Sequence, residues 1–304
     1  MTLHDINADL HCHSIWSDGT LAPAALAARA QAGGVELWAL TDHDELGGQA
    51  EAAQAAKALG LAWISGVEIS VSFAGETVHI VGLDVDLECA ELQAGLAATR
   101  AGRTQRAQAM AQGLAAVGIK GAYEGALAYV TNPALVSRTH FARWLVDSGA
   151  CPDTHSVFRR YLTPNKPGYV DHRWASLGDA VGWIRAAGGI AVIAHPGRYR
   201  FSPSAEYALF SEFKTHGGQG VEVLTGSHGA ADAKKYAATA QEFGLLASRG
   251  SDFHSPAESR TGLGSLPALQ LDLTPVWAKW AKPAHQIDCA NLAQSTIAVA
   301  PDVP

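Results

Sequence analysis

The feature that most constrains the fold is a series of short apolar runs, most of which end in a histidine or a carboxylate. The runs alternate with helical, often Ala-rich stretches, and they are Ile6–Leu10, Val35–Leu40, Leu61–Val67, Gly189–Ala194, Gly220–Leu224 and Leu245–Ala247. Buried strands that alternate with helices are typical of a parallel sheet or an α/β barrel. In such a fold, strand ends from distant parts of the chain converge on one face.

The side chains at these strand ends are of the metal-binding kind. His11 and His13 follow the first run, and alternate residues of a strand share a face, so both imidazoles point to the same side. The further candidates are His43, Glu68, His195, Asp252 and His254 at strand ends, with His79 inside a predicted strand over Glu76–Leu83. We therefore predict a metal centre to which several strands contribute ligands.

The donor set indicates which ions fit. Imidazoles and carboxylates without thiolates suit Mn²⁺, Fe²⁺ or Zn²⁺, whereas Mg²⁺ prefers more oxygen donors. The candidates exceed the needs of one ion, so we expect two or three divalent ions, with Mn²⁺ favoured, Zn²⁺ or Fe²⁺ as alternatives, and Glu68 as the natural bridge. The four cysteines show no C-x-x-C spacing, which argues against a disulfide framework or a zinc knuckle.

A helical, basic segment interrupts the alternation. We assign residues 1–90 and 171–304 to a discontinuous catalytic unit and residues 91–170 to an inserted helical subdomain. Between Leu92 and Val170 there are nine Lys or Arg and three acids, a net charge of +6. Because the whole chain has a net charge of −7, the remaining residues carry −13. This asymmetry predicts a small anionic substrate that meets the insertion on one side.

Composition excludes several other classes of function. The net charge of −7 argues against a long nucleic acid as partner, because Lys and Arg contacts to phosphate supply most of that affinity. No stretch approaches the roughly 20 apolar residues that span a bilayer, and the first residues lack the regions of a signal peptide. We expect a cytoplasmic enzyme without a membrane partner, and we infer no protein partner.

Taken together, the motifs resemble those of the PHP (polymerase and histidinol phosphatase) metal-dependent phosphoesterases. The motifs are Asp9–His13 with Ser17–Gly19, Thr41–Asp44, Glu68, His79, Ala194–Pro196 and Gly250–His254. The resemblance implies a distorted (β/α)7 barrel with two or three metals. It implies three ligand groups, namely His11, His13, Glu68 and Asp252; Glu68, His79 and His195; and Asp18, His43 and His254.

Two further positions carry open roles. Asp18 stands where some relatives use His, so it is a ligand of the third ion, a general acid or an orienter of phosphate. His228 follows the Gly220–Leu224 run and is a candidate general acid or phosphate donor, with an ordinary helix-start histidine as the alternative. We count Glu68, Asp18 and His228 as the catalytic candidates.

The insertion resembles the branch that hydrolyses nucleoside 3′,5′-bisphosphates and short oligonucleotides. The matching parts are Arg103, Arg106, Ser137–Arg143 and Asn165–Val170, although Thr139 stands where Pro is usual. We expect Arg103, Arg106, Arg138, Lys166 and His228 to contact substrate phosphate, because Arg forks bind phosphate oxygens bidentately. A solvated helix face is the alternative for these cations.

The function implied is a phosphatase that removes the 3′-phosphate of a nucleoside 3′,5′-bisphosphate such as pAp. One alternative is a 5′-to-3′ exonuclease on short oligoribonucleotides, which needs the same pocket. An alternative of another class is a non-catalytic PHP module that only binds metal; the complete set of candidate ligands argues against it.

Overall fold

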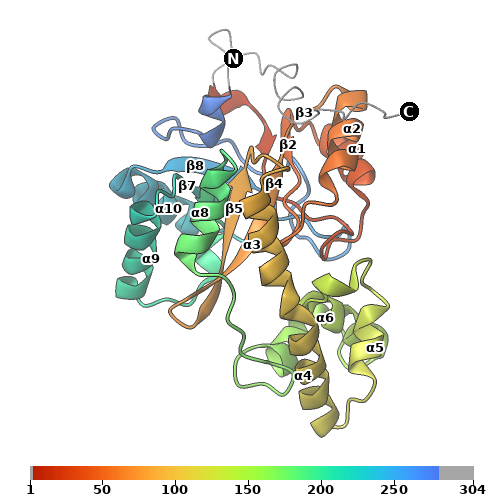
Figure 1. The fold of residues 1–304 in the computed structure, drawn as a ribbon. Helices are drawn as coiled ribbons and strands as arrows, with labels where there is room; N and C mark the ends of the chain where they lie inside the picture. Colours follow the sequence, from red (N-terminus) through yellow and green to blue (C-terminus); the bar gives the residue numbers. More distant parts are fainter. Residues whose placement is uncertain (1–2, 281–304) are drawn as a thin grey trace, which may run out of the picture.

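The computed structural model describes residues 3–280 and has a mixed α/β fold built around two sheets (Figure 1). The smaller sheet is parallel, in the order β1 (Ala8–Asp9), β2 (Leu37–Ala39) and β3 (Ala62–Ile64). The larger sheet has the order β4 (Gly66–Phe73), β5 (Glu76–Leu83), β6 (Ile190–Ile193), β7 (Gly220–Thr225) and β8 (Leu246–Gly250). Strand β5 is antiparallel to both of its neighbours, whereas β6, β7 and β8 are parallel.

The two sheets meet but do not close into one barrel. On one side, the backbone N–H of Leu10, just after β1, donates to the carbonyl of Arg249 in β8 at 3.1 Å. On the other side, the N–H of Glu68 in β4 donates to the carbonyl of Asp42 at 3.1 Å, beyond β2. The structure thus confirms the α/β class and has two open sheets with an antiparallel hairpin; it does not confirm the (β/α)7 barrel.

The run predicted as one strand, Leu61–Val67, is two strands in different sheets. The chain changes sheets at Ser65 and Gly66, where the Ser65 hydroxyl donates to the Val85 carbonyl at 2.6 Å. A Cβ on Gly66 would lie 2.7 Å from the carbonyl oxygen of Leu40, so only glycine permits this close approach. We predicted Glu68 at the end of a strand. Because the new strand begins at Gly66, Glu68 instead lies inside β4.

Helices cover the outer faces of both sheets (Figure 1). They are α1 (Pro23–Ala32) and α2 (Gln49–Leu59) beside the smaller sheet, and α8 (Leu177–Ala186), α9 (Pro203–Thr215) and α10 (Ala230–Phe243) over the larger one. Helix α2 begins after a turn at Glu45, whose carboxylate accepts hydrogen bonds from the backbone of Leu46 and Gly47, at 2.8 and 2.9 Å.

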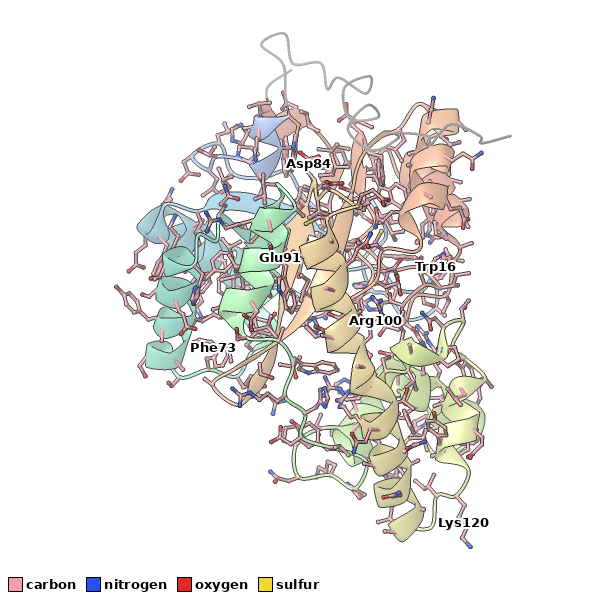
Figure 2. The ribbon with its side chains drawn as sticks, viewed as in Figure 1. Trp16, Phe73, Asp84, Glu91, Arg100 and Lys120 are labelled. Atoms are coloured by element: carbon pink, nitrogen blue, oxygen red, sulfur yellow. The ribbon has the colours of Figure 1, made fainter. Side chains whose placement is uncertain are left out.

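The segment between β5 and β6 is mainly helical, as predicted. It comprises α3 (Ala90–Ala101), α4 (Arg103–Ala116), α5 (Ala122–Leu127), η2 (Pro133–Leu135), α6 (Arg138–Asp147), α7 (Thr154–Val157) and the π-helical η3 (Phe158–Leu162). Helices α4 to η3 enclose a hydrophobic cluster of their own. Helix α3 packs instead on α8, where Gly95 lies against Trp183. Figure 2 shows α4 continuing away from Arg100 toward Lys120, at the far end of the segment.

The rest of the described chain contributes to the core or to loops. The short helix η5 (Val276–Lys279) places Trp277 in the main core, and Cys12, Cys89 and Cys151 are free thiols. Cys289 lies outside the described residues. Among the helices of residues 3–280, none has the length and apolar character needed to cross a bilayer.

Candidate functional site

The structure brings all nine predicted metal ligands into one connected, largely buried cluster. They are His11, His13, Asp18, His43, Glu68, His79, His195, Asp252 and His254. Four overlapping groups within the cluster have ligand atoms that all lie within 4.8 Å of one another. The residues come from the ends of β1, β2, β6 and β8, from one loop, and from the interiors of β4 and β5.

Glu68 lies at the centre of the cluster. Its Oε1 atom is 2.9 Å from Nδ1 of His79 and 3.0 Å from Nε2 of His195. Its Oε2 atom is 2.8 Å from Nδ1 of His43 and 3.3 Å from Nε2 of His13. The carboxylate therefore faces two sets of imidazoles, which is the geometry expected of a bridging ligand.

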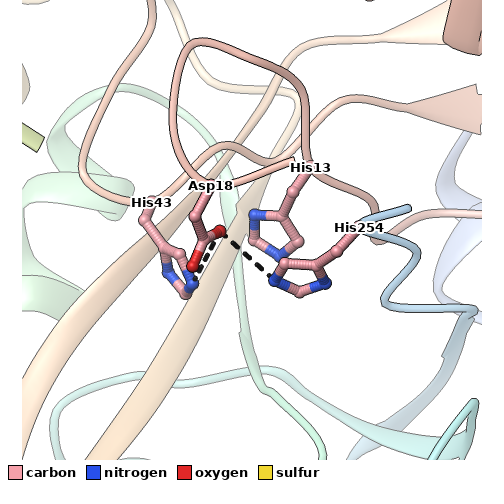
Figure 3. A group of neighbouring side chains, drawn as sticks. All are labelled: His13, Asp18, His43 and His254. Carbon is pink, nitrogen blue, oxygen red and sulfur yellow. Dashed lines mark ion pairs between the residues drawn. The ribbon is translucent and has the colours of Figure 1, made fainter. Parts of the chain in front are cut away.

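Asp18 belongs to the same cluster. Its Oδ1 atom is 3.3 Å from Nε2 of His254 and 3.7 Å from Nε2 of His43 (Figure 3). The rings of His13 and His254 stack with their centroids 4.1 Å apart. The other oxygen of Asp18 accepts a hydrogen bond from the Ser137 hydroxyl at 3.3 Å, so this residue also meets the helical insertion.

The surroundings of the cluster favour an anionic Glu68 and a neutral His13. Burial alone would raise the pKa of Glu68, but His79, His43 and His11 outweigh it and hold that pKa well below its usual value. Burial, with His254 and His43 nearby, lowers the pKa of His13 to about 3. Neutral imidazole and ionised carboxylate are the forms that bind metals.

The cluster also needs a cation. Burial would lower the pKa of His43, yet Glu68 and Asp18 raise it to about 9, which shows how strongly these carboxylates attract positive charge. Oδ1 of Asp18 is buried without a hydrogen-bond partner, and Oε2 of Glu68 and Nδ1 of His43 are buried 2.8 Å apart without the geometry of a hydrogen bond. Such atoms are unfavourable unless a ligand satisfies them. The residues present therefore fit divalent metal ions.

Glu222 on β7 orients this cluster, and the sequence analysis did not single it out. Its carboxylate accepts from Nδ1 of His11 at 2.8 Å and from the backbone N–H of His195 at 2.6 Å. The first contact leaves Nε2 of His11 free to bind a metal. An acid inside an otherwise apolar strand was the signal that could have revealed it.

A second carboxylate, Asp42, supports His13 only indirectly. It accepts from the backbone N–H and hydroxyl of Ser14 at 2.7 and 2.6 Å, and from the Ser17 hydroxyl at 2.5 Å. The Ser17 hydroxyl lies 3.4 Å from Nδ1 of His13. Asp42 thus fixes the loop that carries His13 and does not contact an imidazole of the cluster directly.

Three residues of the site have a left-handed backbone. The φ angles are +28° at His195, +54° at Asp252 and +50° at Asp44. Such conformations are unfavourable for residues other than glycine and persist where surrounding contacts enforce them. The backbone here is bent to aim particular side chains into the cluster.

A cavity of about 210 Å³ extends from the cluster to the insertion, and two of its arginines lack an acidic partner. Arg106 and Arg138 line it, and neither forms an ion pair with any residue of the described chain. Burial, together with Arg138 and Arg103, lowers the pKa of Arg106 to about 9. Crowded, buried guanidinium groups of this kind attract an anion.

Two other arginines of the cavity are paired. Arg103 forms an ion pair with Asp44 and contacts the Ser70 hydroxyl at 3.2 Å, so its guanidinium already has an anionic partner. Arg198, in the short helix η4 (Pro196–Arg198), forms an ion pair with Asp252 and lines the same cavity. The sequence analysis overlooked Arg198, although it stands three residues after His195.

Two predicted substrate contacts lie elsewhere. Lys166 is exposed in a turn closed by its backbone N–H on the Thr163 carbonyl, and it does not line the cavity. His228 uses both ring nitrogens on the backbone, with Nδ1 3.0 Å from the Val223 carbonyl and Nε2 accepting from Gly197 N–H at 3.1 Å. The structure therefore favours the alternative for His228, a histidine that joins two backbone segments before α10.

Known proteins resemble this chain over most of its length. Residues 9–127 match the model of the PHP domain. A Chromobacterium violaceum protein named 3′,5′-nucleoside bisphosphate phosphatase is 52% identical over 271 residues, which are 89% of this chain and 95% of the relative. The chain belongs to the PHP domain family. A Haemophilus influenzae protein named 5′-3′ exoribonuclease is 41% identical over 272 residues, which are 90% of this chain and 98% of the relative.

Solved structures show the same PHP fold. A Chromobacterium violaceum structure described as an amidohydrolase, with bound sulfate and no metal, superposes with a TM-score of 0.87 at 52% identity over 90% of this chain and 95% of that chain. A Bifidobacterium adolescentis protein, proposed to be a metal-dependent phosphoesterase, gives 0.74 at 27% identity over 88% of this chain and 92% of that chain.

Proposed function

We propose that this PHP domain protein is a metal-dependent phosphomonoesterase that removes the 3′-phosphate of a nucleoside 3′,5′-bisphosphate, such as pAp, and leaves the 5′-monophosphate. The observation that carries the proposal is one cavity with a metal-binding cluster on one wall and two unpaired arginines, Arg106 and Arg138, on the other. A substrate with two phosphates matches both walls. The phosphatase from Chromobacterium violaceum supports this assignment.

We propose two or three ions, with Mn²⁺ favoured and Zn²⁺ or Fe²⁺ as alternatives. The ligand groups are His11, His13, Glu68 and Asp252; Glu68, His79 and His195; and Asp18, His43 and His254. Bound divalent ions supply Lewis-acid stabilisation of charge on the phosphoryl oxygens. We assign Asp18 to the ligands because its unpartnered Oδ1 faces His43 and His254.

The protein's own groups bind and orient the substrate in this proposal. Arg106 and Arg138, from the insertion at residues 91–170, hold the phosphate that is not cleaved. Glu222 keeps His11 in one tautomer and fixes the backbone of His195. Arg198, beside Asp252, adds positive charge where the reacting phosphate binds. Residues 1–90 and 171–304 thus supply the metal wall, and the insertion supplies selectivity.

A 5′-to-3′ exonuclease activity on short oligoribonucleotides is the second candidate. The relative from Haemophilus influenzae favours it, and the same two walls suit a terminal nucleotide whose 5′-phosphate is held by the arginines. The non-catalytic alternative is less well supported, because a complete ligand set and unpaired cations share one cavity.

Phosphate release from pAp, 5′-AMP and a short 5′-phosphorylated oligoribonucleotide tests the proposal. We expect Mn²⁺-loaded protein to release phosphate from pAp, to leave 5′-AMP intact and to lose activity on chelation. Faster release of mononucleotides from the oligomer would favour the exonuclease. No turnover of any of these substrates by fully loaded protein would overturn the enzymatic proposal.

A further inference from the structure

A second cavity, of about 460 Å³, lies beside the first and contains none of the candidate metal ligands. It lies between the tip of the β4–β5 hairpin and residues 169–173. Thr77 lines both cavities, so the two spaces adjoin at this residue. Figure 2 shows Phe73 and Asp84 at opposite ends of the hairpin, which places the second cavity at the Phe73 end.

One face of the hairpin leads from the metal cluster to this cavity. In the β4–β5 register, Ser70 lies opposite His79 and Ser72 lies opposite Thr77. Residues two apart in a strand share a face and are separated by about 7 Å. Glu68, Ser70 and Ser72 therefore follow one another on this face, and Ser72 and Thr77 reach the wall of the second cavity. A ligand anchored at the metals can extend along this line.

The wall between the cavities is fixed by one tryptophan. Nε1 of Trp174 donates to the Thr77 hydroxyl at 3.3 Å, and the ring lies under Arg106, 5.3 Å from its guanidinium carbon. His172, which lines the second cavity, packs edge-on against Trp174 with ring centroids 4.2 Å apart. The second cavity therefore lies close to the position of a phosphate bound by Arg106.

The chemistry of the second cavity differs from that of the first. Its walls carry the aromatic rings of Phe73, Tyr169 and His172, and the carboxylates of Glu76 and Asp171. Neither carboxylate forms an ion pair within residues 3–280, and Arg173 is the single Lys or Arg among the lining residues. Aromatic faces stack on nucleobases, and carboxylates accept hydrogen bonds from exocyclic amino groups. The volume is that of a site for a small organic group.

We propose that this second cavity is the nucleobase subsite, and that it selects bases with an exocyclic amino group over uracil. This inference rests on the proposed function, because it assumes that the anion held in the first cavity belongs to a nucleotide. Tyr169 provides a stacking surface, and Asp171 with Glu76 accepts the amino group. The two cavities then divide one nucleotide between them, with phosphates in the first and the base in the second.

Calorimetric titration of Mn²⁺-loaded protein with 5′-AMP, 5′-UMP and ribose 5-phosphate tests the subsite without turnover of pAp. We expect 5′-AMP to bind about tenfold more tightly than ribose 5-phosphate, since stacking of one base contributes about 1–3 kcal/mol. We expect 5′-UMP to lie between them. Tyr169→Ala should reduce the AMP advantage to about twofold or less, and Asp171→Asn should bring 5′-AMP and 5′-UMP together.

Phe158→Ala is the matched control, because Phe158 is an aromatic residue of the first cavity only. It should leave the ratio of AMP to ribose phosphate unchanged. Equal affinities of the wild type for 5′-AMP and ribose 5-phosphate would overturn the subsite. Loss of base dependence in Phe158→Ala but not in Tyr169→Ala would also overturn it.

Hydrolysis of pAp, measured on the same preparations, separates this inference from the proposed function. Base-dependent binding without phosphate release from pAp would overturn the function and leave the subsite standing. Phosphate release from pAp with no base-dependent binding would overturn the subsite and leave the proposed function standing. Asp171→Asn keeps the size of the side chain and so covers the case in which Tyr169→Ala fails to fold.

Discussion

The two walls of the first cavity carry opposite charge, and neither is balanced within the protein. Oε2 of Glu68 and Oδ1 of Asp18 are buried anionic oxygens without a hydrogen-bond partner, whereas Arg106 and Arg138 have no acidic partner among the described residues. Neither arginine forms an ion pair with these carboxylates. Each wall is therefore complete only with a ligand, metal ions on one side and phosphate on the other.

The walls also differ in how they are held. The metal wall is held by backbone hydrogen bonds of both sheets. The arginine wall belongs to helices whose contacts with the rest of the protein include the ion pair of Arg103 with Asp44 and the double hydrogen bond from Arg143 to Glu258, at 2.9 and 2.6 Å. Changes in the metal wall should therefore affect every substrate, and changes in the arginine wall should affect only substrates with a second phosphate.

The largest effect is expected for Glu68→Gln. Loss of the central carboxylate charge should lower kcat/KM about a thousandfold or more on both pAp and an aryl phosphate, because all neighbouring imidazoles lose a common partner. Steady-state assays at saturating Mn²⁺ measure it, with Glu91→Gln on the exposed face of α3 as the control. Retention of a tenth of wild-type activity would contradict the central role of Glu68.

A smaller effect is expected for Glu222→Gln. This change weakens the acceptor for His11 and should raise the Mn²⁺ concentration at half-maximal activity about 10- to 100-fold, as for other partners of metal-bound histidines. Activity titrated with Mn²⁺ measures the shift for both pAp and aryl phosphate. An unchanged metal dependence would show that Glu222 only supports the fold.

Arg106→Ala separates the two walls directly. It should reduce kcat/KM for pAp about 10- to 100-fold, since hydrogen bonds to charged groups contribute roughly 1.5–3 kcal/mol, while an aryl phosphate changes by no more than about twofold. Arg159→Ala, at an exposed position of the same insertion, is the control. Equal losses on both substrates would remove the distinction between the walls.

The smallest effect is expected for Lys166→Ala. Because Lys166 is exposed and does not line the cavity, kcat/KM for pAp should stay within about twofold of the wild type. The same assay used for Arg106→Ala measures it. A loss as large as that of Arg106→Ala would return Lys166 to the set of phosphate contacts.

The sequence predicted the metal side of the site better than the arginine side. Alternating apolar runs place residues such as His11 and Asp252 at converging strand ends, and this local pattern needs no knowledge of side-chain packing. The role of Arg103 and the place of Lys166 depend on how the helices of the insertion pack. That Asp44 pairs with Arg103 follows from the tertiary structure alone.

The fold was predicted at the level of class but not of topology. Periodicity identified most strands and helices, yet it did not show that Gly66 turns the chain into a second sheet or that β5 runs antiparallel. Glu222 was missed for a related reason. A single acid in an apolar strand is read as a surface residue unless the strand is known to be buried on both sides.

The left-handed backbone at His195 and Asp252 lowers the stability of the fold, whereas the side chains of these residues are needed for the proposed activity. Glycine adopts these angles without strain, so a glycine at either position would relax the backbone and also remove buried groups that need ions. Selection of variants for heat resistance alone, without metal or substrate, would favour loss of these two side chains. Efforts to stabilise the protein should therefore leave the loops after β6 and β8 unchanged.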